Sequence, residues 1–188
     1  MRAGVLALQG DFAAHARALG GAAPVRRAEE VDRLDLLVIP GGESTTLLTL
    51  LSTPEGNGVE EAVRRLVSRG GVVFGTCAGA ILLAKGVTRP AQASWGLLDI
   101  DVERNAYGRQ LDSFEAVLEP EGYEAVFIRA PRIVRVGPGV EVLARHGGDP
   151  VLVREGRVFA ATFHPELTSD RRLHRRVAVA AASAVSVR

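Results

Sequence analysis

Short runs of consecutive apolar residues alternate with segments of helical periodicity along the first half of the chain. Unbroken apolar runs are typical of strands that are buried on both faces of a sheet. Such strands are predicted at residues 4–8, 35–40 and 71–74, with a weaker one near 24–27. Helices are predicted at residues 12–19 (capped by Asp11), 47–51, 59–68 and 80–85, with a turn-rich loop at 53–58. This alternation predicts a parallel sheet with helices on both faces, whose ligands gather at the carboxyl ends of the strands.

The pattern changes after residue 85, where strand-like runs follow one another with few helices between them. These runs lie at residues 97–102, 114–118, 125–128, 140–144, 151–153 and 158–163. We expect a mixed or antiparallel extension of the same sheet, finished by a helix over about residues 170–185. The predicted fold class is therefore α/β. It is a single domain over residues 1–188 with three α/β/α layers, in which a mostly parallel central sheet carries an antiparallel extension.

Composition excludes several classes of protein. The 188 residues fit one domain, and 23 basic residues against 22 acidic ones leave no electrostatic footprint for nucleic acid. One cysteine excludes an internal disulfide framework. The apolar tract at residues 177–187 is interrupted by serines and too short for a bilayer, and residues 1–10 reach polar side chains too early for a signal peptide. We therefore expect a cytoplasmic protein with no nucleic-acid or membrane partner.

The single cysteine, Cys77, lies between a predicted strand and a predicted helix. Gly75 and Gly79 flank it at the spacing G-x-C-x-G, which permits the tight turn that exposes a nucleophile above a sheet. The amino terminus of the following helix favours a thiolate at this position. A small buried apolar residue is the alternative interpretation of a lone cysteine.

One histidine stands where a base for this cysteine is expected. His164 ends the predicted strand at residues 158–163, whereas His15 and His174 are interpreted as solvated helix residues and His146 as a turn residue. A polar loop after a strand is the alternative for His164 and its neighbours.

A thiol nucleophile needs a base, and the base needs an orienting acceptor. Cys77, His164 and Glu166 have the residue types for these three roles. The glycines that follow residue 40 are typical of a turn, but the Gly42 amide, with that of Ala78, could also hold an oxyanion beside the cysteine.

Two of these motifs together resemble a known family. The elbow at residues 75–79 and His-Pro-Glu at residues 164–166 resemble the class I (triad) glutamine amidotransferases, which implies a flavodoxin-like fold. Further stretches resemble the glutaminase subunit of pyridoxal 5'-phosphate synthase, namely residues 4–10, 40–45, 102–110, 113–115 and 127–131. The resemblance runs from end to end of the chain.

The resemblance implies the roles of the site residues. Cys77 attacks the side-chain amide of L-glutamine and forms a thioester, His164 protonates the leaving nitrogen and then activates water, and Glu166 orients His164. The implied substrate-binding residues are Gly42, Glu43, Ser44, Arg104, Ile128 and Arg129. An arginine suits the carboxylate of the amino acid and Glu43 suits its ammonium, although either arginine could equally belong to a structural ion pair.

The resemblance also implies a partner. A separate synthase subunit of pyridoxal 5'-phosphate synthase, in a hetero-oligomer with this chain, takes the ammonia through a tunnel for vitamin B6 biosynthesis. Gln9 and Gly10 are candidates for its docking surface, as is the arginine cluster at residues 171–176, which is better interpreted as a solvated helix face. We expect neither a metal ion nor a cofactor.

Three alternatives remain open at this point. The chain could be a glutaminase subunit of another amidotransferase, such as that of histidine biosynthesis. It could be a cysteine peptidase or chaperone of the same broad fold, although the His-Pro-Glu after the late strand argues against this. A regulatory binding subunit without turnover is the non-enzymatic alternative, and the presence of all three triad residue types disfavours it.

Overall fold

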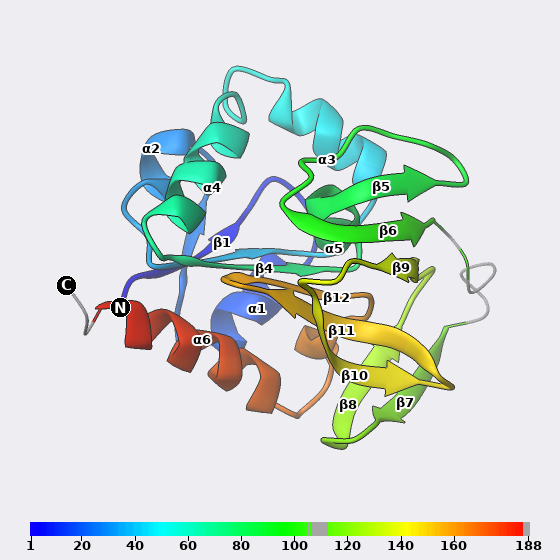
Figure 1. Ribbon diagram of the computed structural model, residues 1–188. Coiled ribbons are helices and arrows are strands. Elements are labelled where there is room, and N and C mark those ends of the chain that lie inside the picture. The colour runs from blue at the N-terminus through cyan, green and yellow to red at the C-terminus, as the bar shows by residue number, and fades with distance from the viewer. Residues whose placement is uncertain (105, 107–112, 186–188) are drawn as a thin grey trace.

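A computed structural model of the chain describes residues 1–104, 106 and 113–185 (Figure 1). Within the stretch at residues 102–110 that carried part of the family resemblance, residues 105 and 107–110 lie outside the described residues.

A seven-stranded sheet forms the centre of the described structure, in the order β10-β11-β12-β4-β3-β1-β2. Its strands are β1 (Ala3–Leu6), β2 (Ala23–Val25), β3 (Leu36–Ile39), β4 (Val72–Thr76), β10 (Glu141–His146), β11 (Asp149–Glu155) and β12 (Val158–Ala161). Neighbours from β2 to β12 pair in parallel, whereas β11 and β10 pair antiparallel. The predicted fold class, mostly parallel with an antiparallel extension, is confirmed.

Helices cover both faces of this sheet (Figure 1). One face carries α1 (Phe12–Ala18) and α6 (Arg172–Val185), and the other carries α2 (Ala28–Val31), α3 (Ser44–Leu51), α4 (Val59–Ser68) and α5 (Ala78–Leu83). The predicted cap of α1 is confirmed, because the Ala14 N–H donates to Asp11 Oδ1 at 2.8 Å. Two hydrophobic cores result, one on each side of the sheet.

Strand β3 shows why the central strands are continuously apolar. Leu36 and Val38 point into the core beneath α1 and α6, while Leu37 and Ile39 point into the opposite core. All four are fully buried, because successive side chains of a strand face opposite sides of the sheet and both sides are covered here.

The prediction that the strands after residue 85 all extend the central sheet is wrong. Of the strands described after residue 83, β10, β11 and β12 join the central sheet, whereas the others form two small sheets of their own. A three-stranded sheet contains β5 (Ala84–Thr88), β6 (Leu98–Glu103) and β9 (Arg132–Val136), and a two-stranded sheet contains β7 (Phe114–Leu118) and β8 (Tyr123–Phe127). Apolar runs alone do not reveal which partner a strand takes. The helix predicted at residues 80–85 overlaps the start of β5, and the sequence patterns do not predict α2 or β9.

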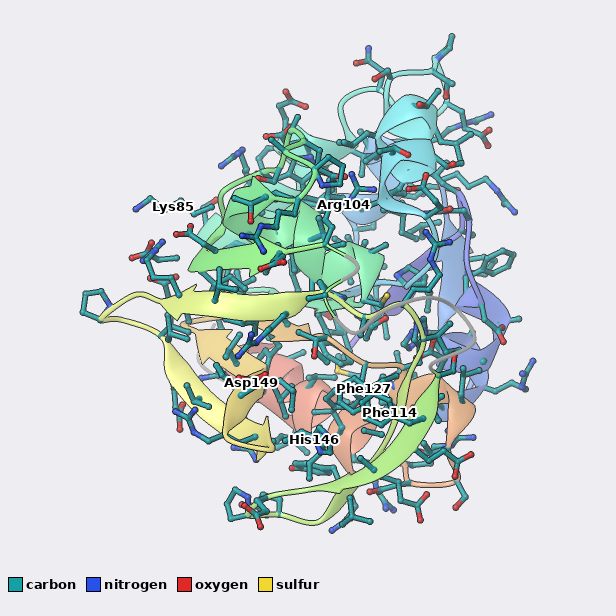
Figure 2. The ribbon with its side chains drawn as sticks, turned by 90° about the vertical axis from the view of Figure 1, so that its right-hand side faces the viewer. Lys85, Arg104, Phe114, Phe127, His146 and Asp149 are labelled. Carbon is teal, nitrogen blue, oxygen red and sulfur yellow. The ribbon has the colours of Figure 1, made fainter. Side chains whose placement is uncertain are left out.

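The hairpin β7–β8 is anchored by stacked rings (Figure 2). Phe114 and Phe127 stack with centroids 4.7 Å apart, and the His146 ring lies 5.3 Å from that of Phe114. His146 is the last residue of β10, and its ring packs against this hairpin. The prediction of a turn residue, which was based on the following glycines, is therefore wrong.

Strand order reverses between β1 and β3, since β1 leads to β2 on one side and the chain then returns to β3 on the other. A crevice outside the carboxyl ends of the strands is expected at such a reversal. Residues 9–10, 40–44, 77 and 164 follow β1, β3, β4 and β12 at this edge. Among the described residues, no helix combines the length and the apolar character needed to cross a membrane.

Candidate active site

Cys77 occupies a strained turn between β4 and α5. Its φ is 47° and its ψ is −104°, a conformation that few residues other than glycine adopt. The turn is held by the Cys77 N–H, which donates to Ala161 O of the neighbouring strand at 2.8 Å. Gly75 and Gly79 pack so closely against each other that a Cβ on Gly75 would collide with the Gly79 backbone. The glycines thus allow the turn that presents the cysteine above the sheet.

His164 and Glu166 lie beside this cysteine. The backbone N–H of His164 donates to Val126 O at 2.8 Å. Pro165 then begins the short 3-10 helix η2 (Pro165–Leu167), which contains Glu166. His164 Nδ1 lies 2.8 Å from Glu166 Oε1, and the Glu166 side chain is only 1% exposed. The structure therefore brings together the candidate base and its candidate orienting acceptor.

The protonation of this pair follows from its surroundings. Burial lowers the pKa of His164, but the adjacent Cys77 and Glu166 outweigh burial and raise this pKa to about 10. Burial raises the pKa of Glu166, but hydrogen bonds from His15 and His164 outweigh it and hold the pKa well below the usual range. The arrangement therefore favours an imidazolium at His164 and a carboxylate at Glu166.

A small pocket of about 210 Å³ opens at Cys77. It is lined by Gly42, Glu43, Ser44, Cys77, Ile81, Arg104, Ile128, Arg129 and His164. All six residues that the resemblance implied for substrate binding are in this set. The pocket is smaller than the roughly 300–1,000 Å³ of pockets for drug-sized ligands, so it suits a small metabolite.

Glu43 and Arg104 place opposite charges at this pocket. Glu43 caps α3 by accepting hydrogen bonds from the N–H groups of Thr45 and Thr46 at 3.2 and 2.7 Å. Burial raises the pKa of Glu43, but hydrogen bonds from Thr45 and Thr46 outweigh it and lower this pKa to about 2. Arg104 Nη2 lies 3.3 Å from Glu43 Oε1, so the two form an ion pair. Such a pair matches both charges of an amino acid.

The loop after β3 packs directly on the reactive groups. A Cβ added to Gly41 would collide with the His164 ring and come within 3.1 Å of Cys77 Cβ. Gln9 holds the next residues of the loop, since its Nε2 donates to Glu43 O at 2.8 Å and its Oε1 accepts from the Glu43 N–H at 3.3 Å. Gly10 also packs against Gly41, at a φ of 77°. Gln9 and Gly10 therefore support the glycine loop from behind.

Other predicted residues lie close to Cys77. Ile128 O is 3.9 Å from Cys77 Sγ, and Arg129 has a φ of 46° at the pocket wall. Ala78 is fully buried as the first residue of α5. Ser44 donates to Gln92 Oε1 at 2.8 Å. Gln92 carries no motif that would have marked it in the sequence.

The sequence interpretation of two histidines was wrong. His15 and His174 are both 0% exposed, and His15 Nε2 lies 3.2 Å from Glu166 Oε2. Helical spacing contains the missed signal, since Phe12, Ala16 and Leu19 place His15 on the apolar face of α1. His174 likewise shares a face of α6 with buried residues at 177 and 181. Ile81 of the pocket was missed because it reads as an ordinary residue of a buried helix.

No group of three or more His, Cys, Asp or Glu residues suited to a metal ion is found in the described ranges 1–104, 106 and 113–185.

Known proteins are similar to this chain in sequence and in structure. The model of the SNO glutamine amidotransferase family matches residues 5–180. A protein of Solibacter usitatus named pyridoxal 5'-phosphate synthase subunit PdxT is 54% identical over 187 residues, covering 92% of this chain and 95% of the relative. A Thermus thermophilus protein of the same name is 55% identical over 181 residues, covering 92% of this chain and 93% of the relative.

Solved structures of other proteins are similar to this fold. A crystal structure described as a glutamine amidotransferase superposes with a TM-score of 0.88 at 51% identity, over 97% of this chain and 100% of the other. The structure of PurLQS from Thermotoga maritima, at 18% identity and a TM-score of 0.63, shares the fold over 98% of this chain and 96% of the other. By its sequence, its fold and the arrangement around Cys77, the chain belongs to the SNO glutamine amidotransferase family.

Proposed function

We propose that this chain hydrolyses L-glutamine to L-glutamate and ammonia as the glutaminase subunit of a pyridoxal 5'-phosphate synthase. One observation carries the proposal: Cys77, on its strained turn, shares a small pocket with His164 and with the Arg104–Glu43 ion pair. The names of the relatives at 54% and 55% identity support the assignment to this synthase. Residues 1–188 act as one glutamine amidotransferase domain.

Charge complementarity orients the substrate in the pocket. The α-carboxylate of glutamine pairs with Arg104, aided by Arg129, while its α-ammonium pairs with Glu43. Gly42, Ser44 and Ile128 complete the binding surface. The side-chain amide then extends toward Cys77, which lies in the same pocket.

The first half of the reaction forms a thioester. Cys77 Sγ attacks the amide carbon, and the electron pair of the C=O bond moves onto oxygen, where the N–H groups of Gly42 and Ala78 hold it. His164 gives its proton to the amide nitrogen. The C–N bond breaks as the C=O bond re-forms, and ammonia leaves.

The second half releases glutamate. His164, now neutral, takes a proton from water, and the resulting hydroxide attacks the thioester carbon. The C–S bond breaks, so that the Cys77 thiolate and the His164 imidazolium are restored. Glu166 Oε1, 2.8 Å from His164 Nδ1, keeps the imidazole in the orientation that both proton transfers need.

The ammonia passes to a synthase subunit bound to this chain in a hetero-oligomer. Gln9 and Gly10 are candidates for the surface that meets this partner, because they support the glycine loop beside Cys77. The arginine cluster is a weaker candidate. Arg171, Arg172 and Arg176 already donate hydrogen bonds to Thr168 O, Asp170 and the Tyr123 hydroxyl within the chain. A cytoplasmic location stays a prediction from the sequence.

The alternatives are less favoured. A glutaminase subunit of histidine biosynthesis does not agree with the names of relatives at 50–55% identity, such as those of Solibacter usitatus and Thermus thermophilus, which are named as subunits of pyridoxal 5'-phosphate synthase. A peptidase needs a groove for an extended chain, whereas the Cys77 pocket has a volume of only about 210 Å³.

A glutamate-release assay with and without the synthase subunit tests the proposal. The wild-type chain is expected to hydrolyse glutamine slowly alone and faster with the synthase, and Cys77→Ala is expected to show no turnover in either case. Thermal unfolding of Cys77→Ala serves as the control for an intact fold. Turnover retained in this variant would exclude the mechanism, and equal wild-type rates with and without the synthase would exclude the coupling.

A further inference from the structure

A buried polar cluster lies behind the candidate triad, on the side away from the pocket. It contains Thr76 of β4, His15 of α1, His174 of α6 and Glu166 of η2, all at most 4% exposed. His15 Nδ1 lies 3.0 Å from His174 Nε2, and His15 Nε2 lies 3.2 Å from both Thr76 Oγ1 and Glu166 Oε2. The two helices that cover one face of the sheet thus each send a histidine toward the acceptor of the triad.

Glu166 Oε2 needs a donor. Its partner oxygen, Oε1, lies 2.8 Å from His164 Nδ1, whereas Oε2 accepts no hydrogen bond in the part of the chain that the structure describes. The nearby nitrogen that could supply one is His15 Nε2, at 3.2 Å. A buried carboxylate oxygen without a donor is strongly destabilising. A proton on His15 Nε2 removes this problem, and the carboxylate attracts that proton more strongly than the neutral Thr76 hydroxyl does.

Counting donors also determines the tautomer of both histidines. With the proton of His15 on Nε2, Nδ1 is free to accept from His174 Nε2–H. His174 Nδ1, which has no partner among the described residues, is then an unprotonated acceptor and not a buried N–H. A proton on His15 Nδ1 would instead force the His174 proton onto Nδ1, where no acceptor receives it. One hydrogen-bonded chain therefore satisfies every buried N–H of the cluster.

The charges around the cluster agree with this assignment. Burial, then the proximity of His15, lower the pKa of His174 to about 3, so His174 is neutral at ordinary pH. The groups that face His15 are Glu166 from η2 and His174 from α6, with Arg171 and Asp170 farther along near His174. His164 and Cys77 follow on the far side of Glu166.

We propose that His15 is a positioning residue for the triad, donating from Nε2 to Glu166 Oε2 so that Oε1 stays directed at His164, and that His174 sets the tautomer of His15. The inference rests on the proposed glutaminase function. It makes the geometry of the triad depend on the packing of α1 and α6, two elements that contribute nothing to the pocket.

Two isosteric variants of His15 separate this role from simple packing. In His15→Gln the side-chain amide can occupy the place of Nε2 and still donate to Glu166. In His15→Asn the amide reaches only the place of Nδ1. Kinetics with the synthase present are expected to show kcat about 10- to 100-fold lower in His15→Asn, as is typical when an outer partner of a catalytic group is lost. KM should not change, because His15 does not line the pocket. His15→Gln should recover most of the turnover.

Two variants of His174 test its role in setting the tautomer of His15. His174→Gln retains a donor toward His15 Nδ1 and should stay close to the wild type, whereas His174→Leu should lower kcat at unchanged KM. Thermal unfolding midpoints of all four variants are measured in parallel. Equal losses of turnover in His15→Gln and His15→Asn that follow their unfolding midpoints would overturn the proposal, as would wild-type kcat in His15→Asn.

A spectroscopic measurement tests the tautomers of His15 and His174 independently of any activity assay. The chain has four histidines, so ¹⁵N-detected tautomer spectra of the full chain can be assigned with the variants above. His15 and His174 are both expected to carry the proton on Nε2, and a proton on His15 Nδ1 would refute the assignment. If the wild type with its synthase released no glutamate, the proposed function would fail, while these spectra would still report on the cluster.

Discussion

Arg104 Nη2 lies 3.3 Å from Glu43 Oε1, so the residue that follows β6 is joined by an ion pair to the cap of α3 at the pocket of Cys77. The Arg104 side chain is only 10% exposed, so water screens this charge poorly. The pair keeps both side chains in place before a substrate arrives. An amino acid can then exchange its carboxylate and ammonium for the two partners without rearranging either residue.

Replacing Glu43 is expected to weaken glutamine binding. Glu43→Gln keeps an oxygen that can cap α3 but removes the charge that pairs with an ammonium. We expect KM for glutamine to rise about 10- to 100-fold at unchanged kcat, since hydrogen bonds between charged groups contribute roughly 1.5–3 kcal/mol. Glu30→Gln is a matched control, because Glu30 also accepts from backbone N–H groups at a helix start, far from the pocket. A lower kcat at constant KM would contradict the assigned role.

A methyl group on Gly41 is expected to disturb the reactive pair. The added Cβ would collide with the His164 ring, and a displacement of about 1 Å at a catalytic group can lower a rate about 100-fold. Gly41→Ala should therefore lower kcat at least tenfold. Gly139→Ala is the control, since its Cβ would meet only Glu155 Oε1, at 3.2 Å. Full activity in Gly41→Ala would show that the loop does not pack on His164 during turnover.

The titration of His164 depends on its neighbours. Its pKa is raised to about 10 because Cys77 and Glu166 outweigh burial. Cys77→Ala removes one of these two partners, so the midpoint of the His164 titration should fall in an NMR experiment. Glu166→Gln should lower it as well, because an imidazolium loses the anion beside it. A midpoint that does not change in Cys77→Ala would contradict a contribution of Cys77 to the raised pKa of His164.

Acid should destabilise the start of α6 through Asp170. Hydrogen bonds from Arg172 outweigh burial and lower the pKa of Asp170 to about 2. A lowered pKa stabilises the fold when the carboxyl is ionised, so this contribution is complete above about pH 4 and disappears as the pH falls through about 2.

Asp170→Asn is expected to reduce the free energy of unfolding by about 1–2 kcal/mol at neutral pH, less than the full linkage value because Arg172 is half exposed. Denaturant unfolding at several pH values should show the difference from the wild type vanishing near pH 2. Asp32→Asn is a control at a more exposed ion pair with Arg65, where about 0–1 kcal/mol is expected. A difference for Asp170→Asn that does not depend on pH would exclude a role for its charge.

Local signals in the sequence were sufficient to predict the parallel strands at the centre of the sheet. The apolar runs at β1, β3 and β4 predicted buried parallel strands, because side chains covered on both faces have no polar alternation. The spacing of Gly75 and Gly79 predicted the turn at Cys77, since the strained backbone needs small neighbours. The small sheets were not predictable in this way, because the pairing of β5 with β6 and of β6 with β9 depends on contacts between distant segments.

The residues of the candidate site likewise differ in whether local sequence motifs reveal them. The sequence predicts the candidate nucleophile and base, because a nucleophile elbow and a histidine at a strand end are local motifs that can be recognised from neighbouring residues. The pairing of Arg104 with Glu43 and the burial of His15 and His174 beside Glu166 become visible in the folded chain alone. These relationships depend on how α1, α6 and the loop after β6 pack. Packing brings together His15 and His174, which are 159 positions apart and which no local pattern connects.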